Sequence, residues 1–81
     1  MPTESLPYGK VKNPAHLGQI VRAKRKQDQL TQADVVALCG IGTRFLSELE
    51  NGKPTLELGK VLQLVACLGL EVTVGPRSWP A

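Results

Sequence analysis

Residues 31–53 constrain the fold of this chain most, because they carry the start and stop signals of two short helices. Thr31 and Asp34 have the spacing of a capping box, in its acidic variant, so a helix is predicted to begin there. Gly40 is the expected residue just beyond the end of that helix, and Gly42 is the expected N-cap of the next. Two short helices joined by a glycine-bearing turn match the local pattern of a DNA-binding helix-turn-helix.

On a helical wheel, residues 42–50 divide into an apolar side and a polar side. Leu46 and Leu49, with the edge of Glu50, form the side that can be buried. Short hydrogen-bonding groups and one arginine form the other side, which suits the edges of bases in a major groove. An ordinary solvated helix face is the alternative interpretation. The polar side consists of Thr43, Arg44, Ser47 and Glu48.

Three segments of the chain resemble the Xre-type helix-turn-helix of lambdoid phage repressors and Cro, and the resemblance covers residues 17–68. Chain length and residues 68–74 make the HipB-like (Y4mF-like) antitoxins the most similar members. The resemblance implies a lambda-repressor-like helix-turn-helix domain of four helices. The segments are Leu30-Thr-Gln-Ala-Asp-Val-Val, Cys39-Gly-Ile-Gly and Leu46-Ser-Glu-Leu-Glu-Asn-Gly-Lys53.

The same resemblance implies which side chains contact DNA. Gln32 lies at a helix N-terminus, where free backbone N–H groups attract an anion, and the family's Gln at this position binds a phosphate. Asn51 and Lys53 resemble further phosphate-binding positions, although a C-cap and a solvated lysine are their alternatives. Apart from the resemblance, Arg22 is expected to point outward from the first helix; a solvated face is the default for it, and a phosphate contact is the functional alternative.

Base readout is assigned to the polar side of the predicted third helix. Arg44 is the strongest candidate, because a guanidinium reaches O6 and N7 of guanine together. Thr43 and Ser47 suit several bases or a thymine methyl group. Glu48 is expected either to accept a hydrogen bond from a cytosine amine or to orient Arg44. Phe45, at the border of this surface, is expected either in the core or against a thymine methyl.

Two more features follow from the resemblance. It implies an ion pair between Arg25 and Glu50 that locks the first helix to the recognition helix. Such a pair fixes geometry more surely than it adds stability. Gly42 departs from the family pattern, which often has a Ser N-cap at this point, so one phosphate contact is weakened.

The chain is predicted to be mostly α, with a short strand near its end. Residues 1–12 are interpreted as an N-terminal arm, residues 13–69 as the DNA-binding domain and residues 76–81 as a flexible tail. Asn13-Pro14 is a strong start signal for the first helix, and Thr55 is the expected N-cap of the fourth. The apolar residues of that fourth helix, at helical spacing, are Leu58, Val61, Leu62, Val65 and Leu68.

Residues 70–75 change to a strand-like period. Leu70, Val72 and Val74 alternate with polar residues, which predicts a half-buried strand without a clear partner in the chain. A lone edge strand invites pairing with another chain. We therefore expect it to pair with its copy in a symmetric homodimer; pairing with residues 6–12 is the alternative.

Composition excludes several classes of protein. The net charge of +3 is compatible with a polyanion but does not by itself indicate one. Cys39 and Cys67 lack the spacing of a metal site and are expected to be small core hydrophobes, so no metal or cofactor is predicted. No set of residues that could form a catalytic site is present, so the chain is not expected to be an enzyme. No signal peptide or membrane span is visible, which predicts a cytoplasmic protein that does not bind membranes.

The resulting functional hypothesis is a dimeric repressor that binds a palindromic operator in double-stranded DNA. The HipB-like resemblance adds a HipA-like serine/threonine kinase toxin as partner, with the chain acting as antitoxin and autorepressor. Leu38 and Trp79 are candidate anchors for a partner, with a scattered surface residue and a disordered end as their alternatives. A stand-alone phage-type repressor and a helical protein-binding module without DNA activity are the competing hypotheses.

Overall fold

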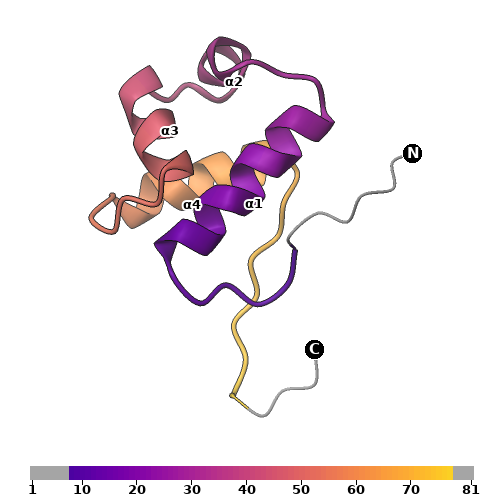
Figure 1. Ribbon diagram of the computed structural model, residues 1–81, viewed down its shortest axis with the longest axis vertical. Helices are drawn as coiled ribbons and strands as arrows, with labels where there is room; N and C mark the ends of the chain where they lie inside the picture. Colours follow the sequence, from indigo (N-terminus) through magenta and orange to yellow (C-terminus); the bar gives the residue numbers. More distant parts are fainter. Residues whose placement is uncertain (1–7, 78–81) are drawn as a thin grey trace.

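The computed structural model describes residues 8–77 and contains four helices in that part of the chain. They are α1 (Pro14–Gln27), α2 (Gln32–Cys39), α3 (Thr43–Glu50) and α4 (Leu58–Cys67). Both α1 and α2 pack on α3, and α2 also packs on α4. Figure 1 shows α2 and α3 joined by a short turn at one end of the molecule. The architecture is the mostly helical, four-helix form of a helix-turn-helix domain.

The first two helices begin at the capping residues that the sequence predicts. The Asn13 side chain accepts a hydrogen bond of 2.8 Å from the backbone N–H of His16, and Pro14 occupies the first helical position. At the start of α2, the Asp34 N–H donates to Thr31 Oγ1 at 3.0 Å, while the Thr31 N–H donates to Asp34 Oδ2 at 2.9 Å. Both halves of the capping box are therefore formed.

The turn between α2 and α3 depends on glycine at its first position. Gly40 has a φ of +68°, in the left-handed region that side-chain-bearing residues rarely adopt, and its N–H donates to the carbonyl of Val36. Gly42 is the N-cap of α3 but supplies no side-chain hydrogen bond. The turn brings α3 across α2 and directs one side of α3 outward.

The four helices share one aliphatic core. Leu46 and Leu64, together with Val21 and Val35, are completely removed from solvent. Phe45 and Leu56 are half-buried and pack against this core. The buried apolar residues are Ile20, Val21, Val35, Cys39, Ile41, Leu46, Leu49, Val61, Leu64, Val65 and Leu68.

The fourth helix differs from the sequence prediction in two respects. It begins at Leu58 with Glu57 at the N-cap, so the prediction of Thr55 as the cap is wrong. The chain stays irregular through Leu56, whose side chain packs against the core before the helix begins. The buried stripe is Val61, Leu64, Val65 and Leu68, whereas Leu58 and Leu62 are 66% and 45% exposed. Because α4 is apolar on more than one side, periodicity alone did not show which side faces the core.

Beyond α4 the structure assigns no strand to residues 70–77, so the predicted strand is not formed within this single chain. Leu70 is half-buried against the core, and the segment then leaves the helices (Figure 1). Backbone groups form a strand only where a neighbouring strand accepts their hydrogen bonds. Within the described part of the chain, no helix combines the length and apolar character needed to span a membrane.

The prediction for the two cysteines also differs from the structure. Cys39, at the end of α2, and Cys67, at the end of α4, are joined by a disulfide with 5.8 Å between their Cα atoms. Cys39 is buried, but Cys67 is exposed, so the description of both as core hydrophobes is wrong. No local signal in the sequence indicated the pairing, because the two cysteines are 28 positions apart and meet only through the packing of α2 on α4.

Candidate nucleic-acid interface

The outer side of α3 carries the polar residues, and its inner side anchors the helix in the core. Leu46 and Leu49 are buried, whereas Thr43 and Arg44 are exposed and Ser47 is half-buried. The Arg44 side chain is 89% exposed. The helix therefore presents a guanidinium and two hydroxyl groups to the surroundings from a rigid, well-packed element.

Glu48 lies between two cationic side chains on this surface. Its Oε2 accepts hydrogen bonds from Arg44 Nε at 3.1 Å and from Lys53 Nζ at 3.2 Å. The hydrogen bond from Arg44, followed by that from Lys53, holds the pKa of the Glu48 carboxyl below its usual value. The carboxylate is therefore ionised at neutral pH and draws the two cations together along one edge of α3.

The end of α3 is closed by Asn51. Its side-chain Nδ2 donates to the carbonyl of Ser47 at 2.9 Å, and its backbone N–H donates to the same carbonyl at 3.1 Å. Asn51 itself remains exposed. The residue thus caps the helix in this structure, which was the alternative to a phosphate contact.

A partly buried polar cluster joins α1, α2 and α3 behind the outer side of α3. Arg25 donates from Nε to Glu50 Oε2 at 2.7 Å and from Nη2 to Glu50 Oε1 at 3.0 Å. A third bond runs from Arg25 Nη1 to the carbonyl of Leu30 at 2.9 Å, and Gln32 Nε2 donates to Glu50 Oε1 at 3.2 Å. The hydrogen bond with Glu50 raises the pKa of Arg25 above its usual value. This is the pair that the resemblance implied.

The remaining predicted residues are dispersed over the surface. Arg22 is exposed on α1, and Leu38 is exposed on α2. Val72 and Val74 are exposed, the latter at 90%. Trp79 lies outside the described residues, as do most of the positions predicted for the N-terminal arm.

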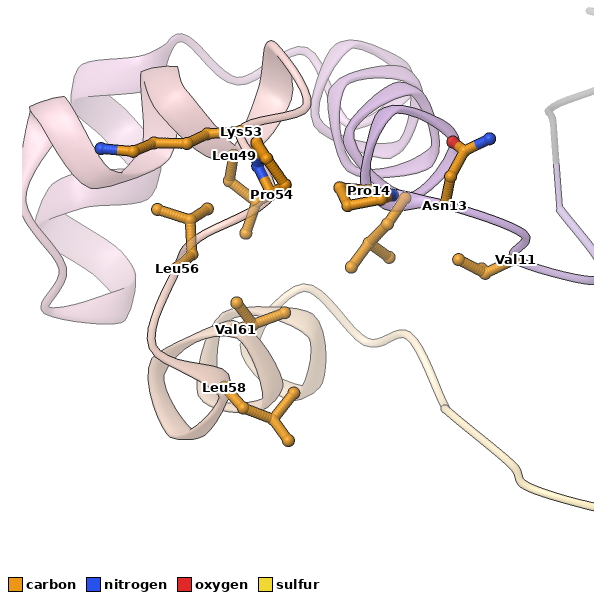
Figure 2. A pocket seen from close by; sticks show the side chains of 10 residues that line it. Val11, Asn13, Pro14, Leu49, Lys53, Pro54, Leu56, Leu58 and Val61 are labelled. Carbon is orange, nitrogen blue, oxygen red and sulfur yellow. The ribbon is translucent and has the colours of Figure 1, made fainter.

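Two features near the site were not found from the sequence. Gly18 of α1 lies against the backbone carbonyls of Leu49 and Glu50, an approach that a side chain would prevent. A glycine inside a predicted helix was the available signal for it. The second feature is a largely apolar pocket of about 250 Å³ beside Lys53, lined by residues from the start of α1, the α3–α4 loop and α4 (Figure 2).

Comparisons with known proteins agree with this geometry. The family model described as "Helix-turn-helix", HTH_3, matches residues 21–74. The chain is 42% identical over 65 residues to y4mF, an uncharacterized HTH-type transcriptional regulator of Sinorhizobium fredii, covering 80% of this chain and 86% of that protein. It is also 27% identical over 63 residues to the regulator y4dL of the same organism, covering 78% of this chain but only 32% of that protein.

Solved structures of HipB share the fold. HipB in a HipB-O4 20mer complex superposes with a TM-score of 0.78 at 22% identity, covering 88% of this chain and all of that one. A chain of the HipA-HipB-O2-O3 complex matches with the same TM-score, identity and coverage. At this level of identity the similarity concerns the fold. The extent of the family match and the close relationship to y4mF show that this chain belongs to the Xre-type helix-turn-helix family of DNA-binding transcriptional regulators, which is not a class of enzymes.

Proposed function

We propose that this protein is a dimeric repressor that places α3 in the major groove of a palindromic operator. The observation that carries the proposal is the division of α3: Leu46 and Leu49 hold it in the core, while Arg44 extends into solvent. A helix held rigidly on one side and polar on the other meets the geometric requirement for direct readout of bases.

The contacts of Arg44 support its role as the main reader. Within residues 8–77, its guanidinium is bound through Nε to Glu48, and the side chain is 89% exposed, so Nη1 and Nη2 are available for O6 and N7 of guanine. Glu48 then acts by orienting Arg44 rather than by accepting from cytosine. Thr43 and Ser47 supply hydroxyl groups to neighbouring bases.

Phosphate binding is proposed for residues around the edge of α3. Asn51 and Lys53 follow the C-terminus of α3. Gln32 is the first residue of α2, where backbone N–H groups of the helix N-terminus can bind a phosphate. Arg22 is exposed on α1. These contacts set the register on DNA and make the affinity depend on salt.

A symmetric dimer is proposed through the end of the chain and the outer side of α4. Val72 and Val74 expose apolar side chains, and their backbone lacks a partner strand within residues 8–77. Leu58 and Leu62 are further exposed apolar residues on α4, and Leu58 also lines the pocket of Figure 2. Exposed apolar surface of this kind marks an interface. Two-fold symmetry then predicts half-sites about 34 Å apart, or a multiple of that distance.

The proposal extends to an antitoxin that binds a HipA-like serine/threonine kinase toxin and represses its own operon. Similarity to a HipB chain solved in a HipA-HipB-O2-O3 complex supports this step. Exposed Leu38 on α2 is one proposed anchor for the toxin, and Trp79 is a second one outside the described residues. A protein that binds an operator acts where the DNA is, which we take to be the cytoplasm.

Selection of bound sequences from a random DNA pool, at two salt concentrations, tests the repressor. We expect enrichment of a two-fold symmetric sequence and a marked loss of affinity at higher salt. Absence of any salt-dependent binding would instead identify a protein-binding helical module.

A search for a HipA-like kinase gene beside this one, followed by co-expression of the two proteins, tests the antitoxin role. A stable complex that suppresses the kinase's toxicity is expected, and Leu38→Lys is expected to weaken it. A protein that binds its operator but forms no complex with that kinase is a stand-alone repressor of the phage type.

A further inference from the structure

The disulfide joins two parts of the molecule that have separate roles in the proposed function. Cys39 is the last residue of α2 and directly precedes the turn that orients α3. Cys67 is the last residue of α4 and lies shortly before Leu70, beyond which the chain leaves the helices. The bond therefore connects the end of α2, next to the proposed DNA-contacting helix α3, with the end of α4, next to the proposed dimer segment of residues 70–75. Within residues 8–77, α4 makes its main helix–helix contact with α2, and the disulfide spans this contact.

The two cysteine residues differ in exposure. Cys39 is 7% exposed and lies within the aliphatic core, whereas Cys67 is exposed at the end of α4. The carbonyl of Cys39 also accepts a hydrogen bond from Gln63 Nε2 at 3.1 Å, which holds α2 on α4 independently of the sulfur bond. The thiol of Cys39 also suits an apolar core. The fold is thus compatible with both the bonded and the reduced pair.

We propose that Cys39 and Cys67 form a reversible thiol–disulfide exchange site in which small thiols attack Cys67 first. The stability of the helix-turn-helix then depends on the redox state of those thiols. The effect of this exchange on DNA binding rests on the function proposed above. Disulfides that do occur in a reducing compartment are usually transient or redox-sensing rather than structural.

The chemistry is a balanced two-step exchange with glutathione. A glutathione thiolate attacks the sulfur of the exposed residue Cys67, a mixed disulfide forms there, and Cys39 leaves as the thiolate and takes up a proton. A second glutathione thiolate attacks the glutathione sulfur of the mixed disulfide, which releases Cys67 as a thiol and yields glutathione disulfide. Two electrons pass from two glutathione molecules to the protein, and oxidation follows the same steps in reverse.

The bonded form is the more stable one, because the bond closes a loop that runs from the end of α2 through α3 to the end of α4. Restricting the unfolded chain in this way is expected to raise the Tm by roughly 10 °C or more in a domain of this size. Oxidation then keeps α2 and α3 in the DNA-binding geometry under conditions that loosen the reduced protein.

The test uses the full chain, equilibrated in buffers of graded glutathione to glutathione disulfide ratio. Free thiols are trapped by alkylation and counted by mass spectrometry, and the Tm is measured on the same samples. We expect a single transition between dithiol and disulfide across these ratios, with the Tm following it. A pair that stays oxidised or stays reduced throughout, a Tm independent of redox state, or a disulfide that links two chains would each overturn the proposal.

Single-cysteine variants test the point of entry. Cys39→Ser retains the exposed residue Cys67, whose thiolate is expected to attack glutathione disulfide rapidly, forming a mixed disulfide and releasing one glutathione. Cys67→Ser is expected to react at least roughly tenfold more slowly. Equal rates would show that Cys67 is not the entry point. Cys67→Ser also serves as the control whose Tm does not change with redox state.

DNA affinity measured on the oxidised and reduced samples separates the two proposals. Thiol counts and Tm values test the proposed exchange of the disulfide even if the protein binds no DNA. DNA binding by the Cys67→Ser variant tests the proposed DNA-binding function even if the disulfide does not respond to glutathione.

Discussion

Arg25 in α1 and Glu50 at the end of α3 meet in a two-point ion pair, with Nε–Oε2 and Nη2–Oε1 distances of 2.7 and 3.0 Å. Their side chains are only 10% and 4% exposed. Because the third contact of Arg25 reaches the carbonyl of Leu30, the pair holds the approach to α2 as well as the end of α3. Removal of one partner leaves a buried charge without compensation.

Glu50→Ala should lower the free energy of unfolding by about 3–5 kcal/mol, since it leaves the Arg25 charge buried and unpaired. Urea unfolding measures the change. Lys60→Ala, which breaks the exposed ion pair with Glu57 and leaves the helix cap unchanged, is the matched control and should change stability by less than about 0.5 kcal/mol. The double variant Arg25→Met, Glu50→Leu should recover much of the lost unfolding free energy. If Glu50→Ala were as stable as the wild-type protein, the pair would not act as a buried ion pair.

Gly18→Ala should destabilise the protein by about 1–3 kcal/mol or more, because its Cβ would lie 2.8 Å from the Glu50 carbonyl oxygen. Gly59→Ala, also inside a helix, has no atom closer than 3.8 Å and should instead stabilise by about 0.5–1 kcal/mol. Thermal unfolding of both variants gives the comparison. Equal effects at the two positions would mean that helix propensity, rather than the contact of α1 with α3, decides the outcome.

The capping box at the start of α2 should make stability depend on pH in the acid range. The hydrogen bonds from the Thr31 backbone N–H, and then from its hydroxyl, lower the pKa of Asp34 below its ordinary 3.8. A carboxyl with a depressed folded-state pKa contributes stability that is present above 3.8 and is lost as the pH falls through the folded value.

Asp34→Asn should therefore flatten the decline of unfolding free energy below about pH 4. Urea titrations at a series of pH values measure it, with Glu71→Gln as a control that removes an exposed carboxyl outside the helices. An unchanged acid profile in Asp34→Asn would show that other carboxylates cause the acid sensitivity.

Arg44→Ala and Lys53→Ala should affect the proposed DNA binding in different ways. Loss of Arg44 should reduce affinity by about 1–3 kcal/mol and relax the preference at one base pair. Loss of Lys53 should weaken binding to all sequences and reduce the salt slope by about one. Lys60→Ala, an exposed lysine on α4, serves as control. A uniform loss for Arg44→Ala would assign that residue to phosphate binding instead.

Val74→Lys should weaken the proposed dimer, because it places a charge in the apolar row of the terminal segment. Thr73→Lys adds the same charge at the adjacent position, whose side chain points to the opposite side of a strand. Sedimentation equilibrium at micromolar concentration should show dissociation for Val74→Lys and a retained dimer for Thr73→Lys. A monomeric wild-type protein at that concentration would contradict the dimer.

Local signals in the sequence were sufficient for most of the secondary structure. Asn13, Thr31 and Gly40 act through contacts with residues only a few positions away, so their effects are visible without a fold. The amphipathic pattern of α3 was equally local, and it predicted correctly that Leu46 and Leu49 would be buried. The prediction of Thr55 as the N-cap of α4 was wrong because Leu56 packs against the core, which is a long-range effect.

Tertiary structure decided which distant groups meet. Helical periodicity left two apolar sides on α4, and only packing against α2 showed that Leu64 is buried while Leu62 is exposed. The same packing brings Cys67 to Cys39, and the approach of α1 to α3 requires glycine at position 18. Hydrogen bonds within one helical turn are encoded by adjacent residues, whereas contacts between helices depend on how the whole core fills space.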